Sequence, residues 1–257
     1  MTALCLLIGL LTPAATTLSF EEFTTLFEEK RADIRIVEAR YEQSILMPGE
    51  TLSTEGRLLY ARPHRLVLRE EETVQIIDQQ RMYDYEPLVR QMEITDFEEN
   101  PLADIIFAAF DESVSKLAER YDLATFTVLD YDEGSQGLRI RPLPESDAAQ
   151  YFEEATIYLR DEDFLPYRIF IEHDAETHRL FEVFDYAINH DYDPEDTRIT
   201  MAPGTRIILN NEPIDTVGEN GGSMPEAIYP TDLTSVVEQD LPAPEMPEGD
   251  AIEVETP

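Results

Sequence analysis

The sequence is poor in several residue types that catalysis and binding often need. It has one cysteine, Cys5, no tryptophan and ten glycines among 257 residues. Cys5 lies in an N-terminal apolar run, so a chain cleaved beyond it has neither thiol catalysis nor a disulfide. The sequence has no glycine-rich phosphate loop and no G-x-S-x-G nucleophile elbow. Without tryptophan, an aromatic-lined sugar cleft for glycoside hydrolysis is not expected.

Positive charge is scarce as well. The chain has 19 Lys and Arg against 55 Asp and Glu, a net charge of −36, and its only lysines are Lys30 and Lys116. Such a surface repels nucleic-acid phosphates and anionic headgroups, so no nucleic acid is expected as a partner. Two explanations of the acid excess stay open. One is solubility, and the other is life at high salt, where counterions screen the self-repulsion.

The residues that bind metals show no site spacing. The four histidines form no H-x-x-x-H pair and lie in no C-x-x-C context; they are His64, His173, His178 and His190. Zinc is therefore not expected. Acidic runs at residues 161–163 and 191–196 offer carboxylates, but neither has the EF-hand spacing for calcium. We expect a protein that is not an enzyme, with no catalytic residues, no metal and no cofactor.

The N-terminus is typical of a signal peptide. Residues 4–11 are apolar, and residues 12–17 include the small residues that a cleavage site needs. No Lys or Arg precedes the run, and Leu4 is not the small residue that a lipoprotein signal places before its cysteine. No other segment approaches transmembrane length. We therefore predict a signal peptide over residues 1–18, cleaved at about residues 14–18, and a soluble periplasmic protein. The alternative is a short buried N-terminal helix.

Helical and strand periods then follow one another. Ser19 and Glu22 have capping-box spacing at the start of an amphipathic helix. From residue 35 the period is two, which predicts an antiparallel meander of short strands up to residue 95. Asn100 is placed to cap a helix that begins at Pro101, a favoured first position. A second short helix is expected over residues 112–120.

Strands resume in the second half of the chain. They are expected near residues 125–131, 137–142, 155–160, 166–173, 177–189 and 205–209, which brings the total to about ten. The predicted fold class is therefore α+β, in one domain over residues 19–211. Beyond Arg206 there are 12 acidic residues and no basic one, with repeated prolines. This composition predicts an acidic, proline-rich disordered tail over residues 212–257.

Several segments, in this order, resemble the LolA family of outer-membrane lipoprotein carriers (the LolA/LolB superfamily). An aromatic residue followed by glutamine occurs at Tyr41 and Gln43. Residues 56–63, GRLLYARP, resemble the family's G-x-L-x-x-x-R-P strand, and residues 100–106, NPLADII, resemble the helix that closes the carrier. Further matches at residues 121–123, 138–142 and 202–205 follow in the expected order. The resemblance covers roughly residues 20–209.

The resemblance implies a fold and a function. The fold is an incomplete, half-open antiparallel β-barrel whose concave face is covered by helices. The function is that of a periplasmic carrier that binds the acyl chains of lipoproteins or related lipids and shuttles them from the inner to the outer membrane. The implied partners are the acylated cargo, an inner-membrane ABC-type release complex and an outer-membrane acceptor, and a monomer is expected.

Site residues also follow from the resemblance and from strand parity. In the family, the arginine that corresponds to Arg62 hydrogen-bonds the lid helix and holds the empty carrier closed, and the alternative is an edge arginine turned to solvent. Parity places four residues on the cavity side: Leu58, Tyr60, Leu66 and Leu68. Three residues form the apolar face of the lid: Leu102, Ile105 and Ile106.

Three alternatives to the carrier remain. One is a hydrolase that acts on lipid and whose active site no motif reveals. The same residues suit an ordinary closed core, because a core and a collapsible cavity need the same apolar side chains. The same half-barrel also suits a sensor or structural domain that binds lipid or protein without transport. Where the family often has aromatic residues after the R-P pair, this chain has Leu66 and Leu68. The cargo could therefore be a glycolipid or another acylated molecule.

Overall fold

A computed structural model of the 257-residue chain describes residues 18–62, 64–78, 81–96, 100–111, 114–128, 135–210, 212–216 and 222–223. All of them belong to one compact unit, Met1–Ser223. The predicted signal peptide lies outside the described residues except for Leu18, and so does most of the predicted tail.

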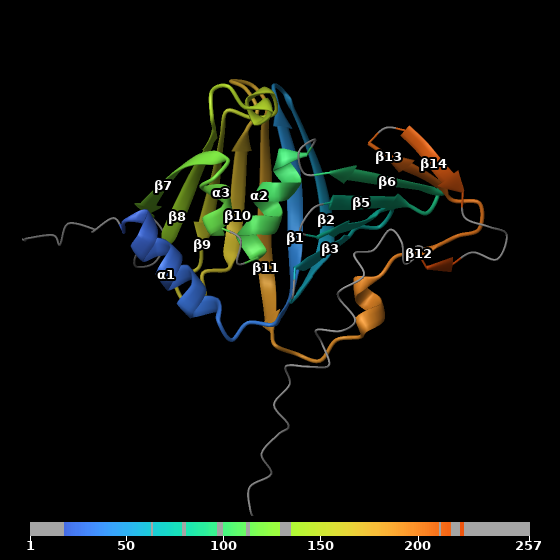
Figure 1. Ribbon diagram of the computed structural model, residues 1–257, viewed down its shortest axis with the longest axis horizontal. Coiled ribbons are helices and arrows are strands. Elements are labelled where there is room, and N and C mark those ends of the chain that lie inside the picture. Colours follow the sequence, from blue (N-terminus) through green and yellow to red (C-terminus); the bar gives the residue numbers. More distant parts are fainter. Residues whose placement is uncertain are drawn as a thin grey trace, which may run out of the picture. The chain divides into compact units, whose positions relative to one another are not determined.

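The described part of the chain forms one large open sheet (Figure 1). Its thirteen strands run in the order β14-β13-β6-β5-β4-β3-β2-β1-β11-β10-β9-β8-β7. Neighbouring strands are antiparallel, apart from β13 and β6, which are parallel. Within the described residues β14 and β7 are the two edges, so the sheet does not close into a barrel. The predicted fold class, α+β with a half-open and mostly antiparallel barrel, is confirmed.

The first six strands form the predicted meander. They are β1 (Ile36–Met47), β2 (Glu50–Ala61), β3 (Arg65–Arg69), β4 (Val74–Ile77), β5 (Arg81–Glu86) and β6 (Gln91–Asp96). Gly49, with a φ of 80°, makes the tight turn between β1 and β2, where a side chain would be strained. Gly56 lies opposite Tyr41 in the β1–β2 register, and the ring of Tyr41 lies over it.

The later strands extend the sheet at both ends. They are β7 (Tyr121–Thr127), β8 (Gln136–Pro142), β9 (Glu154–Leu159), β10 (Pro166–Glu172), β11 (His178–Ile188) and β13 (Arg206–Leu209). Three more strands were not predicted: β12 (Thr200–Met201), β14 (Glu212–Thr216) and β15 (Gly222–Ser223). Of these, β12 and β15 pair with each other in a separate two-stranded sheet. β14 pairs with β13 at one edge of the large sheet. Two 3₁₀ turns, η2 (Asp147–Gln150) and η3 (Pro194–Thr197), lie in the connections.

Three helices complete the described fold: α1 (Phe20–Arg31), α2 (Pro101–Phe110) and α3 (Val114–Leu117). The predicted capping box is present at α1, where Ser19 and Glu22 bond each other's backbone amides. At α2 the side chain of Asn100 accepts a hydrogen bond from the amide of Ala103. The second predicted helix is shorter than expected and has one described turn, α3.

Apolar side chains pack on both faces of the sheet. The main core joins α1, α2 and α3 to the concave face of β1, β2, β3 and β7–β11. On the opposite face of β3–β6, a second buried row contains Val67, Ile76, Tyr83 and Ile94, which are neighbours in the strand register. The segment after β11 packs against this face, since the amide of Ala202 donates to the hydroxyl of Tyr85.

Candidate functional site

The helix α2 is apolar on every side. All ten of its residues are buried, and only Asp104 among them is charged. A helix that is hydrophobic all round needs apolar cover on every side, which a surface position does not supply. The three residues predicted to form the lid belong to the same core as the four predicted to line the cavity. The structure therefore brings the seven residues together.

The predicted cavity is filled by side chains in this structure. Leu58 pairs with Leu68 and Tyr60 with Leu66 across β2 and β3, so all four share one face as their parity predicted. Their exposed fractions are 0%, 3%, 1% and 0% in that order. A site for acyl chains between α2 and the sheet would therefore have to open by displacing α2.

A polar cluster lies at the C-terminal end of α2. The carboxylate of Asp111, the residue that caps the helix, accepts a hydrogen bond from the hydroxyl of Tyr60 at 2.8 Å. Its two oxygens lie 2.9 and 3.1 Å from Nδ1 of His64. Burial raises the pKa of the Tyr60 hydroxyl far above its usual value, and the charge of Asp111 adds to the shift. Tyr60 is therefore a permanent donor, because it stays protonated at every ordinary pH.

Arg31, the last residue of α1, completes this cluster. Its guanidinium donates to the carbonyls of Ala109, at 3.1 Å, of Asp111, at 3.3 Å, and of Phe110. These are the carbonyls that a helix end leaves without intrahelical partners, and a cation there also complements the helix dipole. The side chain is 1% exposed and its guanidinium lies over the ring of Phe27. We call Arg31, Tyr60, His64 and Asp111 the latch.

Arg62, the residue predicted to close the lid, contacts the C-terminal end of α1. Its guanidinium donates to the carbonyls of Arg31, at 2.8 Å, and Ala32, at 3.2 Å. Arg62 therefore holds the end of α1, and Arg31 in turn holds the end of α2. Sequence reasoning missed Arg31, His64 and Asp111. A charged residue in the last turn of an amphipathic helix gives no signal that separates such a role from a solvated one.

A second polar contact holds the beginning of α2. The carboxylate of Asp104 accepts from Arg120 at 2.8 Å and from the hydroxyl of Tyr121 at 3.3 Å. Burial raises the pKa of Asp104, and the bonds from Arg120 and Tyr121 oppose that shift. Between these two polar ends, α2 meets the rest of the protein through apolar side chains.

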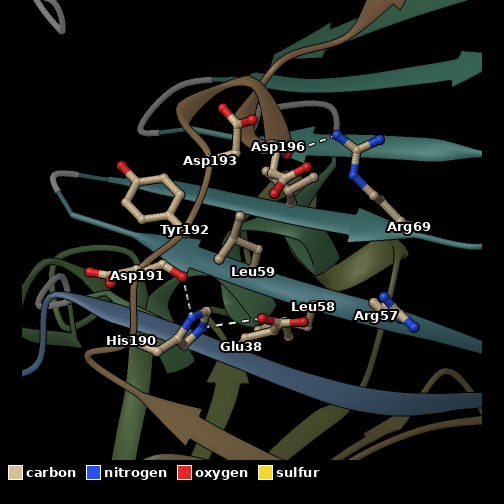
Figure 2. A pocket seen from close by; sticks show the side chains of 11 residues that line it. Glu38, Arg57, Leu58, Leu59, Arg69, His190, Asp191, Tyr192, Asp193 and Asp196 are labelled. Atoms are coloured by element: carbon tan, nitrogen blue, oxygen red, sulfur yellow. Dashed lines mark hydrogen bonds and ion pairs between the residues drawn. The ribbon is translucent and has the colours of Figure 1, made fainter.

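A pocket of about 250 Å³ lies on the other face of the sheet. Glu38, Leu59 and Val67, which pair across β1, β2 and β3, form part of its floor. The segment after β11 forms its wall, where Nε2 of His190 lies 3.2 Å from the carboxylate of Glu38 and Arg69 donates to the carbonyl of Asp196 (Figure 2). The acidic run at 191–196 thus packs against the sheet. No cluster of three or more metal-binding side chains occurs among the described residues.

Comparisons with known proteins give a fold likeness. No protein-family model matches the sequence, and no curated protein matches it. An uncharacterized conserved protein from Thermus thermophilus has a TM-score of 0.47 at 11% identity, with 75% of this chain and 100% of that one covered. An outer membrane lipoprotein-sorting protein domain from Vibrio parahaemolyticus has a TM-score of 0.45 at 9% identity, with 68% and 94% covered. A LolA superfamily protein from Nitrosomonas europaea has a TM-score of 0.37 at 10% identity, with 68% and 97% covered.

The matching structures thus include proteins of the LolA superfamily, which the sequence resembles. At these identities and TM-scores, the likeness says nothing of what this chain binds. Among the described residues, no helix combines the length and hydrophobicity that crossing a membrane requires.

Proposed function

We propose that this protein is a periplasmic carrier that binds acyl chains between α2 and the concave face of the sheet. The observation that carries the proposal is the way α2 is held. Its middle is apolar on every side, whereas its directional bonds gather at the two ends, around Asp104 and Asp111. Contacts without direction can be exchanged for contacts with hydrocarbon at little cost. The hydrogen bonds at the two ends then determine whether α2 remains packed on the sheet.

The free energy gained by burying an acyl chain is similar in size to the free energy needed to break the bonds at the end of α2. Each methylene moved from water into protein stabilises the complex by about 0.8 kcal/mol, so a dodecanoate chain with about ten methylenes gains ~8 kcal/mol. Lifting the end of α2 breaks the three bonds from Arg31 and those from Tyr60 and His64 to Asp111. Each costs about 1–2 kcal/mol, because the acceptors are helix-end carbonyls or a carboxylate. An empty carrier therefore stays closed, and a long chain opens it.

The latch supports release as well as closure. Energy spent in breaking these bonds on entry is regained when the cargo leaves, so closure drives release. In this proposal Arg62 acts by fixing the end of α1 from which Arg31 reaches the lid. The partners would be an acylated lipoprotein or other lipid, an inner-membrane ABC-type release complex and an outer-membrane acceptor. The net charge of −36 suits a monomeric shuttle that does not adsorb to anionic bilayers.

The test uses native mass spectrometry of the full-length protein purified from its own periplasm. We expect co-purifying acylated molecules, and their loss in the double variant Leu102→Asn, Ile105→Asn. Leu143→Asn is the matched control, because Leu143 is 44% exposed and lies away from the core. A ligand-free wild-type protein that also takes up no added dodecanoate would end the proposal. Depletion of the protein from cells distinguishes a carrier from the alternative, a sensor. Outer-membrane lipoproteins become mislocalised if the depleted protein is their carrier but not if it only senses lipid.

A further inference from the structure

Arg179 lies on the apolar, concave face of the sheet. It lies between Ile45 of β1 and Ile171 of β10 in the strand register. Two residues on, Phe181 shares its face and is 0% exposed in the main core. The row continues through Ala155 to Ile140, which are both 0% exposed. Arg179 is thus the charged member of an otherwise apolar cross-strand row.

Among the residues that the structure describes, Arg179 has no acidic partner, although acidic residues outnumber basic ones by 55 to 19 in the sequence. In the described part of the chain it makes no ion pair, and its buried Nε has no hydrogen-bond partner. Nearby strand arginines differ: Arg40 pairs with Glu55 and Asp185, and Arg168 pairs with Glu182. Burial alone lowers the pKa of Arg179, with no opposing carboxylate. An unpaired, half-buried cation is costly, so a folded protein holds one where something else supplies the anion.

The surroundings of Arg179 suit an amphiphile. At the other end of its row, beyond Ile45, Leu52 of β2 is 50% exposed, so the apolar row reaches solvent there. Gln43 on β1 is the diagonal neighbour of Arg179 on β11. The backbones of such neighbours are about 7–8 Å apart, which long side chains can span. A ligand whose chain lies along this face would meet a guanidinium and an amide at the place where its polar end belongs.

We propose that Arg179 binds the oxyanion, a carboxylate or a phosphate, of an acyl ligand whose chain lies in the site under α2. This inference rests on the proposed carrier function and narrows its cargo to anionic amphiphiles. A guanidinium presents two parallel N–H groups to such an oxyanion, which lysine does not. Gln43 is the second donor to the same group.

The test measures binding of dodecanoic acid and methyl dodecanoate to the full chain by equilibrium dialysis at pH 8. The two probes have the same chain and differ in charge. We expect the acid to bind about 10- to 100-fold more tightly, as for hydrogen bonds between charged groups. Arg179→Met should abolish this preference and leave the Kd of the ester within about twofold. Arg168→Met is the matched control, since Arg168 lies on the neighbouring strand with Glu182 as its partner.

The other outcomes of the binding test separate failure of this inference from failure of the carrier function. Equal binding of acid and ester by the wild type overturns the inference and leaves the carrier intact, whereas no binding of either overturns both. Inorganic phosphate that binds as tightly as dodecanoate, and needs Arg179, would indicate a free-anion site and overturn the link to lipid. Dodecyl phosphate distinguishes phosphate from carboxylate as the source of the oxyanion, and dependence on Arg179 for either supports the inference. Unfolding of ligand-free Arg179→Met checks its fold: a less stable variant points to a structural arginine and overturns the inference.

Discussion

The most informative perturbation of the latch is Arg31→Met. Methionine keeps most of the apolar stem of Arg31 but removes the guanidinium, which lies over the ring of Phe27. The carbonyls of Ala109, Phe110 and Asp111 then lose their donor inside the protein. Removing one member of a buried charged cluster costs about 3–5 kcal/mol, a large part of the ~5–15 kcal/mol that stabilises a typical domain.

Hydrogen exchange of the full chain, read by mass spectrometry, is the assay. If α2 is a lid, the lost free energy lowers the cost of opening α2 locally. The population with α2 open should then rise by more than about a hundredfold. Peptides of β10 and β11 should keep most of their protection. Lys30→Met is the control, because Lys30 is the neighbour of Arg31 and bonds the carbonyl of Asp161 instead of α2. We expect it to change stability by less than about 1 kcal/mol.

Two results would refute this reasoning. Unchanged exchange in α2 would mean that Arg31 does not hold the helix. An equal loss of protection in α2, β10 and β11 would mean that α2 opens only when the whole domain unfolds. In that case α2 is part of an ordinary core and not a lid.

Three further predictions test other parts of the account. Arg62→Leu should still bind acyl cargo but release it more slowly, in a transfer assay to acceptor vesicles; normal release would remove Arg62 from the closing mechanism. Gly56→Ala should destabilise the fold by about 1–3 kcal/mol in urea unfolding, because the added methyl group would lie 2.6 Å from both the ring of Tyr41 and the backbone carbonyl oxygen of Arg69; a neutral result would contradict this close packing. Burial raises the pKa of Asp84, so the folded protein binds this proton more tightly than the unfolded chain does. Wild-type stability is therefore lost as pH rises from about 4 through the raised pKa, and Asp84→Asn should be more stable than wild type at pH 7 but not at pH 4; an equal difference at both pH values contradicts this.

Local signals predicted most of the secondary structure. The capping pairs at Ser19 and Asn100 are written in a few neighbouring residues, and both helices begin where these residues place them. The alternation along β1 and β2 put Leu58 and Tyr60 on the face that the structure buries. Parity is a local property, so it survives without knowledge of the partner strand.

Long-range pairing was not predictable in the same way. The parallel contact of β13 with β6 joins segments more than a hundred residues apart. β14 joins the sheet only through its pairing with β13, so its place depends on the same contact. The latch has the same origin: Arg31 is special only because α2 ends beside it. Arg179 is different, because it shares strand parity with Phe181 and Val183. An arginine at a strand position that alternates in phase with apolar residues can be recognised from the sequence alone.

The central claim is that α2 leaves the sheet to admit hydrocarbon. Isotope-filtered NMR of the full chain with dodecanoate in excess tests it most directly, through contacts between ligand methylene protons and side-chain methyl groups. The account predicts contacts to Ile105 on α2 and to both Leu58 and Leu66 on the sheet, since a chain between the two surfaces touches each. Bound dodecanoate that contacts none of these residues, while α2 keeps the chemical shifts of the ligand-free protein, would contradict it.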